Sequence, residues 1–370
     1  MATQVTNYQC PACTGPMHFV GASGRLECDY CGSSYSVEEI EKLYAGKEEK
    51  AAAAFAQAEE KAAAITPEER EYLDAGNDWP EGMKAYNCPS CSAELVCDAT
   101  TAATSCPYCG NPTVIPGQFS GMMKPDCIIP FKIGKEQAIA ALKNHYKGKR
   151  LLPKEFSDQN HLEEIKGVYV PFWLFDSVVD ADVTFHAETS VSYTEGDYDV
   201  TEISHYDVRR AGTVAFEKVP ADASTKMPDD YMDSIEPYHY EEFKPFSSAY
   251  LPGFLADKYD VSKEDCAERA NSRAMRSAVD EMKNTVVGYS SVVVEGQDVN
   301  LHPGKARYAL MPVWLLSTRW QDKSYLFAMN GQTGKLVGDL PVSKKRALQW
   351  FGAIAGALAA VMAVIVMLMG

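Results

Sequence analysis

Two sets of cysteines with the same spacing constrain this chain more than any other feature of its sequence. Each set holds two Cys-x-x-Cys pairs with fourteen residues between the pairs. Two residues between cysteines let a tight turn aim both sulfurs at one ion, and two such turns supply the four thiolates that Zn²⁺ prefers in structural sites. We therefore expect two structural Zn²⁺ ions per chain. The expected ligands are Cys10, Cys13, Cys28 and Cys31 in the first ribbon, and Cys88, Cys91, Cys106 and Cys109 in the second.

Other uses of these cysteines remain as alternatives. Iron–sulfur clusters also take four cysteines, but their usual spacings differ. A redox-active Cys-x-x-Cys would stand at the start of a helix in an α/β domain, which the sequence does not indicate. A disulfide scaffold is typical of short secreted chains rather than one of 370 residues. The remaining Cys97, Cys127 and Cys266 are expected to be small buried side chains rather than ligands.

The charge of the ribbons argues against nucleic acid as a partner. The whole chain has a net charge of −16. Residues 1–37 contain one basic residue, Arg25, and residues 85–116 contain no Lys or Arg. A nucleic-acid surface needs basic side chains that neutralise phosphates. We therefore expect the ribbons to contact protein, or to space and orient the chain, and not to bind DNA or RNA.

The C-terminal segment predicts a membrane span. Residues 347–370 carry no charge, and a helix of this length extends about 36 Å, enough for a hydrocarbon core of about 30 Å. A buried core helix and a C-terminal amphipathic helix are the alternatives. Lys344, Lys345 and Arg346 precede the segment, and positive residues stay on the cytosolic side. The prediction is a single-pass, tail-anchored protein of the cytoplasmic membrane with its soluble domains in the cytosol.

Small residues within this segment offer a route to a homo-oligomer. Gly352 and Gly356 form a G-x-x-x-G pattern, and Ala360 continues it four residues later. Residues at this spacing share one helix face, and small side chains there let two helix backbones approach closely in a membrane. The alternative is that the pattern only reflects the abundance of Gly and Ala in membrane helices.

Composition divides the chain into five segments. Residues 1–37 are the first zinc ribbon, 38–84 a helical spacer rich in Ala, Glu and Lys, 85–118 the second ribbon, 119–343 an α+β domain, and 344–370 a basic flank with the membrane anchor. The predicted fold class is multidomain. It comprises two small zinc ribbons with four cysteines each, a helical spacer, an α+β domain of antiparallel sheets with two main helices, and one C-terminal transmembrane helix.

Two segments of the α+β region repeat one pattern. VYVPFWLFD (168–176) and YALMPVWLL (308–316) both place a Pro, a bulky residue, Trp and Leu inside an apolar run. A second alternating strand follows each of them. A predicted helix precedes each strand pair, one ending at Gly148 and the other beginning at Ser262. We expect two related halves, each laying a helix on an antiparallel sheet.

Periodicity within these elements predicts the buried faces. Alternation places Val179, Ala181, Val183 and Phe185 on the buried side of a strand, and Asp180, Asp182, Thr184 and His186 on the exposed side. The helix after Ser262 has a stripe that faces the core, made of Ala267, Ala270, Ala274, Ala278 and Met282.

The sequence lacks the signatures of common enzymes. It contains no G-x-x-x-x-G-K-[ST], H-E-x-x-H or G-x-S-x-G motif. The seven His are scattered singly, and we expect each to be structural or exposed rather than catalytic. Residues 176–242 carry 17 acidic and 4 basic side chains, which we interpret as a solvated acidic face rather than a Ca²⁺ site. No enzymatic activity is expected.

Several motifs resemble those of bacterial proteins described as TFIIB-type zinc-ribbon-containing membrane proteins. The similar stretches are CPAC and CDYC in the first ribbon, YVPFWLFD (169–176), YLPGFLADKYDV (250–261), LMPVWLL (310–316) and FAMNGQTGKLVGDLP (327–341). Some members of that family occur with PspA-type and SPFH (flotillin-like) membrane-stress proteins and are similar to membrane recruiters for them. The resemblance therefore implies a scaffold role with such proteins as partners.

From these features the sequence predicts a non-enzymatic zinc-ribbon scaffold or adaptor. It would recruit cytosolic proteins to the membrane through protein–protein interaction, in envelope-stress homeostasis. The alternative is a membrane-tethered nucleic-acid-binding or regulatory protein that uses its zinc ribbons as readers.

Overall fold

The architecture comes from a computed structural model. It describes residues 3–4, 8–13, 15–45, 83–87, 94–98, 101–105, 112–114, 124–153, 156, 165–321 and 323–369. Most of the expected spacer lies outside the described residues. So do all four cysteines of the second ribbon, Cys88, Cys91, Cys106 and Cys109.

The first cysteine set lies on a small antiparallel sheet. Its strands are β2 (Met17–Val20), β3 (Arg25–Cys28) and β4 (Ser34–Tyr35), and β3 pairs with both neighbours. A helix over 37–45 follows. Its Ile40 and Tyr44 are buried and share a core with Tyr8, which lies against the Tyr44 ring. The beginning of the segment expected as a solvated spacer therefore packs onto the first ribbon.

Four strands are described around the second cysteine set. They are β5 (Met83–Asn87), β6 (Glu94–Asp98), β7 (Thr101–Ser105) and β8 (Pro112–Val114). The β5–β6 hairpin pairs with the N-terminal strand β1 (Thr3–Gln4). Strand β7 pairs with β8 and with β13 (Leu255–Asp257) of the following domain. This region is thus joined by strand pairing to both the preceding and the following parts of the chain.

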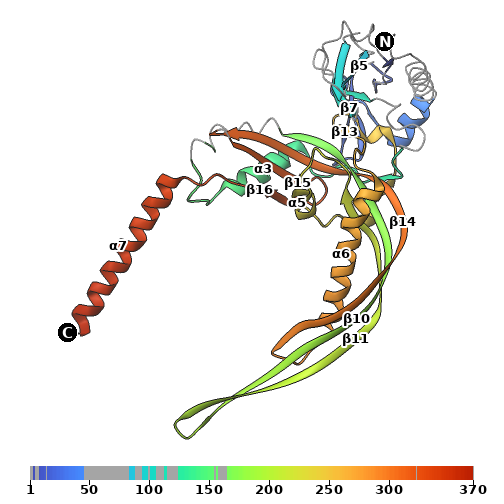
Figure 1. Cartoon of the computed structure of the whole chain (residues 1–370). Helices are drawn as coiled ribbons and strands as arrows, with labels where there is room; N and C mark the ends of the chain where they lie inside the picture. The colour runs from blue at the N-terminus through green and yellow to red at the C-terminus, as the bar shows by residue number, and fades with distance from the viewer. Residues whose placement is uncertain are drawn as a thin grey trace, which may run out of the picture.

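A large antiparallel and mixed sheet forms the main domain. Its long strands are β10 (Lys166–Glu195), β11 (Tyr198–Asp222) and β14 (Ser291–Trp320), completed by β15 (Lys323–Asn330) and β16 (Leu336–Gly338). The pairing places them in the order β11, β10, β14, β15, β16, all antiparallel. Short strands β9 (Cys127–Ile128) and β12 (Lys244–Pro245) extend one edge. The ends of β10 and β11 reach away from the domain as a long hairpin (Figure 1).

The two repeated segments pair with each other across this sheet. Tyr169 lies opposite Pro312, and Pro171 lies opposite Leu310. They therefore form the centre of one continuous sheet, where the sequence predicted two halves with an antiparallel sheet each. After the first repeat, residues 178–186, expected to form a second strand, continue the same strand β10. After the second repeat, the expected second strand is the separate β15.

Each of the two main helices packs on strands that follow the other helix in the sequence. Helix α3 (Lys135–Tyr146) shares a core with Trp314 and Phe327 of the second repeat. Helix α6 (Lys263–Asn284) packs its Ala274 and Ala278 on Val179 of β10, the strand that contains the first repeat. Each helix thus packs on strands of the other half, and α6 also contacts β14.

Equivalent tryptophan bonds reinforce this crossed arrangement. Trp173 Nε1 donates to the carbonyl of Val261, and Trp314 Nε1 donates to the carbonyl of Ile133. Each acceptor stands two residues before the first residue of α6 or α3. The same bond in both halves supports the interpretation of the segments as structural repeats.

Most local predictions for this domain are confirmed. Helix α3 is followed by Gly148 with φ of +77°, a left-handed conformation that suits glycine. Ser262 is the N-cap of α6, and its Oγ accepts from the Asp265 amide at 3.2 Å. The predicted strand face is buried at Val179, Ala181, Val183 and Phe185. Short helices α5 (Asp229–Ser234), η4 (Tyr240–Glu242) and η5 (Ser248–Tyr250) connect the larger elements.

The first ribbon docks directly on the main domain. The amide of Phe19 donates to the carbonyl of Pro252 at 2.8 Å, and the hydroxyls of Tyr8 and Ser248 lie 2.6 Å apart. The rings of Phe19 and Tyr250 meet edge to face. The motif YLPGFL therefore serves as the platform on which the ribbon rests, and the ribbon's core is continuous with that of the sheet domain.

The chain ends in helix α7 (Lys344–Met369), which projects away from the sheet domain (Figure 1). It is the one helix among the described residues that is long and apolar enough to cross a membrane by length and composition. None of the window Lys344–Ala363 is buried by the protein, which argues against a buried core helix. Phe351, Leu358 and Met362 are all exposed.

Candidate metal centre

Two turns bring the first four cysteines together. Cys10 and Cys13 flank a turn in which the Cys10 amide donates to the Gly15 carbonyl at 2.7 Å. Cys28 ends β3, and the Gly32 amide donates back to its carbonyl at 2.9 Å. Gly32 has φ of +70°, a conformation that the side chain of another residue would strain. The sequence builds each turn locally, and the β2–β3 hairpin brings the two turns face to face.

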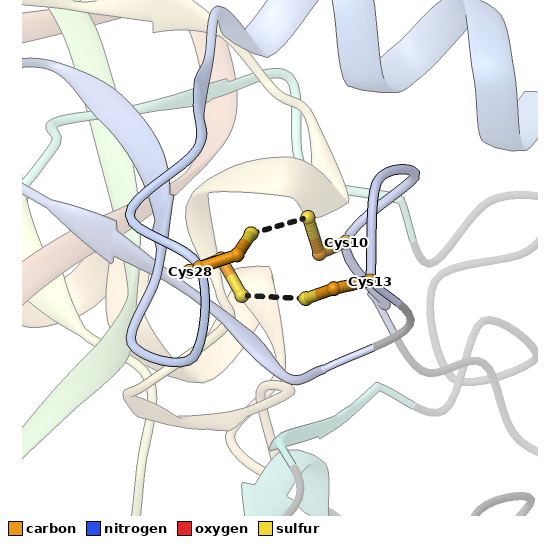
Figure 2. A group of neighbouring side chains, drawn as sticks. Cys10, Cys13 and Cys28 are labelled. Carbon is orange, nitrogen blue, oxygen red and sulfur yellow. Dashed lines mark hydrogen bonds between the residues drawn. The ribbon is translucent and has the colours of Figure 1, made fainter.

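The sulfur geometry suits a tetrahedral ion. The Sγ atoms of Cys10 and Cys31 are 3.6 Å apart, and those of Cys13 and Cys28 are 3.5 Å apart. All four ligand atoms lie within 4.8 Å of one another, and Figure 2 shows the sulfurs converging on one point. A tetrahedron with metal–sulfur bonds of about 2.3 Å has edges of about 3.8 Å. The four cysteines can therefore hold a metal with little rearrangement.

Electrostatics of the cluster favour a cation. Hydrogen bonding with the side chain and backbone of Ser33 lowers the pKa of Cys31 to about 6, which favours its thiolate. A hydrogen bond with the Gly15 backbone lowers the pKa of Cys13, but the neighbouring sulfurs outweigh it and raise this pKa to about 12. Four adjacent sulfurs thus resist carrying negative charge together, and a divalent cation at their centre removes that conflict.

In each Cys-x-x-Cys pair the first cysteine is buried and the second is exposed. Cys10 and Cys28 are buried, whereas Cys13 and Cys31 are exposed. The buried members share the core that also holds Met17 and Leu26. Metal binding here would fix the small sheet of the ribbon, because so few residues cannot bury much apolar surface alone.

The remaining cysteines that the structure describes are not ligands of this set. Cys266 is buried on α6 and its Sγ contacts the Asp222 carbonyl. Cys127 is partly buried on β9. Burial raises the pKa of both thiols to about 11, as expected for small core side chains. Cys97 lies on β6, and its side chain is outside the described residues.

One side-chain cluster was not predicted from the sequence. The histidines are scattered singly along the sequence, but His186 of β10 and His205 of β11 meet across the hairpin together with Glu188. Strand register is the reason, because Glu188 pairs with His205 and His186 pairs with Asp207. Both imidazoles are at least partly exposed, as expected. The sequence does carry a signal, a His followed two residues later by an acid in both strands, which places each pair on one face.

Asn330 and Gln332 of the FAMNGQTGKLVGDLP motif have a structural role, because their buried side chains bond backbone groups of neighbouring segments. Asn330 is fully buried, and its Nδ2 donates to the Ile235 carbonyl at 3.0 Å while its Oδ1 accepts from the Gln332 and Thr333 amides. Gln332 is also buried and bonds both backbone groups of His239. The stretch FAMNGQTGKLVGDLP thus holds the 235–242 segment against β15 and β16.

The fold and the cysteine set define a class of protein in which a four-cysteine ribbon docks on a sheet domain that ends in an exposed apolar helix. No family model matches the chain, and no solved structure matches it. It is 34% identical over 366 residues to YdjG, described as an uncharacterized protein, from Bacillus subtilis strain 168, and the match covers 99% of each chain. The chain therefore belongs to the same family as YdjG.

Proposed function

We propose that this protein is a non-enzymatic, single-pass, tail-anchored scaffold or adaptor that recruits cytosolic proteins to the cytoplasmic membrane. The main support for the proposal is a pair of hydrogen bonds that attach the start of α7 to the folded domain. The Ser343 amide donates to the Leu151 carbonyl at 2.9 Å, and Arg346 donates to the Leu152 carbonyl at 2.5 Å. An apolar helix that begins directly at this bonded edge would hold the domain against the membrane surface rather than on a flexible linker.

The flank of α7 suits a position at the membrane surface. Arg150 lies over the ring of Trp350, with its guanidinium carbon 4.8 Å from the ring centroid. Trp favours the interface between lipid and water, and Lys344, Lys345 and Arg346 favour its cytosolic side. The soluble domains would then face the cytosol, where thiols stay reduced and available to metal.

In this proposal both ribbons hold structural zinc, two ions per chain. Zinc is supported by the four-thiolate donor set and its tetrahedral spacing. The first-set residues that would hold it are Cys10, Cys13, Cys28 and Cys31, and the second-set residues are Cys88, Cys91, Cys106 and Cys109. Four protein ligands leave no position open for substrate, so the ion would stabilise the fold rather than catalyse.

The surroundings of the first ribbon favour protein over nucleic acid. Its one basic side chain, Arg25, is bonded to Ser34 and lies 3.6 Å from Glu39. One flank of the ribbon is used in docking on Pro252. A phosphate backbone needs several unpaired cations along one surface. The ribbon as a nucleic-acid reader is therefore the weaker proposal.

The partners proposed are PspA-type or SPFH (flotillin-like) proteins in envelope-stress homeostasis. The family resemblance described above supports this choice. A scaffold that pairs through Gly352 and Gly356 would bind a polymeric partner with increased avidity, because several copies engage at once.

Anchoring is tested first, by membrane fractionation of the full chain. The wild type should sediment with membranes and resist extraction by high salt. The double variant Leu358→Arg, Met362→Arg should lose the membrane fraction, because each charge at a helix centre costs about 2.5–3.5 kcal/mol on insertion. The matched control Leu358→Ile, Met362→Leu should fractionate like the wild type. A wild-type chain that remains soluble would refute the anchor.

Recruitment is tested by affinity capture from detergent-solubilised membranes after crosslinking in cells. The wild type should capture a membrane-stress protein that the arginine variant does not. DNA and RNA binding across a range of salt concentrations is measured in parallel. Tight binding that weakens steeply with salt would show several phosphate contacts and would favour the nucleic-acid alternative.

A further inference from the structure

The outward face of the β10–β11 hairpin carries a row of polar side chains. The opposite face is apolar and packs on α6 through Val179, Val183 and Phe185. Along the polar face Asp182 pairs with Arg209, and Asp180 accepts from Thr213. Each of these acids has a complementary partner. The next cluster along the row has a different character, because two imidazoles and a carboxylate converge on the same space.

Three ligand atoms of this cluster point at one another. His186 Nε2 lies 3.2 Å from His205 Nδ1, His205 Nδ1 lies 3.2 Å from a Glu188 oxygen, and that oxygen lies 3.6 Å from His186 Nε2. A tetrahedral ion with bonds of about 2.05 Å to nitrogen and oxygen requires about 3.3 Å between its ligand atoms. The three separations match one face of such a tetrahedron.

Hydrogen bonding alone does not satisfy this arrangement. Glu188 as a carboxylate is an acceptor only, and each neutral imidazole nitrogen either donates or accepts. If His205 Nδ1 donates to Glu188, it cannot also accept from His186. If His205 Nδ1 instead accepts from His186, it carries no hydrogen, and its lone pair is directed at the lone pairs of the Glu188 carboxylate. A cation at the centre satisfies all three atoms at once.

The surroundings hold the cluster in place and leave it open to an ion. Glu188 pairs directly with His205 in the strand register, and the neighbouring Phe185 and Ala187 are buried in the core beneath. The side chains of His186, Glu188 and His205 are 40%, 34% and 57% exposed. The second nitrogen of His186 lies 4.0 Å from Asp207. This distance is too long for a hydrogen bond, but a small rotation of the exposed Asp207 side chain would place its carboxylate behind a ligating imidazole, the arrangement common around protein-bound zinc.

We propose that His186, Glu188 and His205 form a binding site for a divalent first-row transition-metal ion such as Zn²⁺. The ligands are His186 Nε2, His205 Nδ1 and one oxygen of Glu188. Three protein ligands leave a fourth position open to solvent, unlike the closed four-thiolate set. The mixed nitrogen and oxygen donors favour a transition metal over Ca²⁺ or Mg²⁺, which prefer oxygen alone. This site goes beyond the scaffold role, since it needs neither the ribbons nor the anchor.

The test titrates the full chain, purified in detergent with its cysteine sites saturated and excess metal removed, with Zn²⁺ alone. Calorimetry should detect an additional, weaker site in the wild type. Titration with Co²⁺ should give absorption from nitrogen and oxygen ligands without a new thiolate charge-transfer band. Affinity should fall as the pH is lowered, because protons compete with metal for imidazole.

Variants separate this site from the rest of the protein. His205→Ala should weaken the additional site by more than about 100-fold, and Asp207→Asn by about 10-fold, because a supporting residue costs less than a ligand. His302→Ala is the matched control, since His302 lies on the same polar face but pairs with Asp180. It should bind like the wild type. The exposed variants should keep the wild-type circular dichroism spectrum.

Two outcomes overturn the proposal. One is the absence of an additional site in the wild type once the cysteine sites are saturated. The other is an additional site that survives in both His186→Ala and His205→Ala. Neither outcome bears on membrane anchoring or recruitment, which are measured separately.

Discussion

Docking of the first ribbon on the sheet domain can be broken at one glycine. A Cβ atom added at Gly21 would lie 1.9 Å from the carbonyl oxygen of Phe131. Real Cβ contacts essentially never fall below 3.0 Å, so Gly21→Ala must separate the two backbones by at least about 1.1 Å, the difference between those distances. The obstacle is backbone rather than a flexible side chain. The Phe131 ring is itself fixed by stacking on Phe254, with centroids 4.0 Å apart.

The energetic consequence is large for one methyl group. Overpacking in a rigid site costs about 1–3 kcal/mol, and we expect the upper end here because Phe131 is buried and held on several sides. A loss of about 3 kcal/mol should lower the melting temperature by roughly 6–12 °C in a domain of this size. The displaced ribbon should also lose the bond from the Phe19 amide to Pro252.

Hydrogen exchange distinguishes undocking from unfolding. In Gly21→Ala the Phe19 amide should exchange faster, while the Cys10 amide, which is bonded to Gly15 within the cysteine turn, should keep its protection. Gly296→Ala is the matched control, since a Cβ there meets open space. Unchanged melting and unchanged protection at Phe19 would refute the docking geometry.

Three further predictions concern the metal, the buried charge and the membrane helix. Metal analysis of the wild type should find two zinc ions per chain. Cys13→Ser should leave about one, since losing one ligand usually destroys a four-thiolate site. A folded protein without zinc would contradict this prediction. Burial raises the pKa of Asp222 from 3.8 to about 6 even though Arg269 is its partner. Because the pKa of Asp222 is higher in the folded state, this carboxyl stabilises the fold below about pH 4, and the stabilisation is lost as the pH rises through about 6. Over that pH range the free energy of unfolding of the wild type should fall by up to about 3 kcal/mol relative to that of Asp222→Asn. Denaturant unfolding at several pH values measures the difference, and parallel curves for the two proteins would show that the acid is not perturbed. Replacing Gly352 and Gly356 by Leu should reduce oligomer size in detergent and recruitment of the captured partner; if neither changes, the pattern is only composition.

The sequence by itself determined the features that depend on neighbours along the chain. The Cys-x-x-Cys spacing predicted the cluster of Cys10, Cys13, Cys28 and Cys31, because each turn is built from consecutive residues. Ser262 and the alanine stripe predicted α6 and its buried face, since helical periodicity is local. The uncharged run at the C-terminus predicted an apolar helix of sufficient length to span a membrane.

The tertiary structure alone decided which distant segments meet. Nothing local in the sequence says that Tyr169 pairs with Pro312, that α3 covers the second repeat, or that the ribbon rests on Pro252. His186 and His205 likewise come together only through the register of a long hairpin, where a slip of one residue between the strands would put them on opposite faces. The physical reason is that these contacts join residues far apart in sequence, so they depend on which surfaces bury each other in the folded chain and leave little trace in the pattern of either segment.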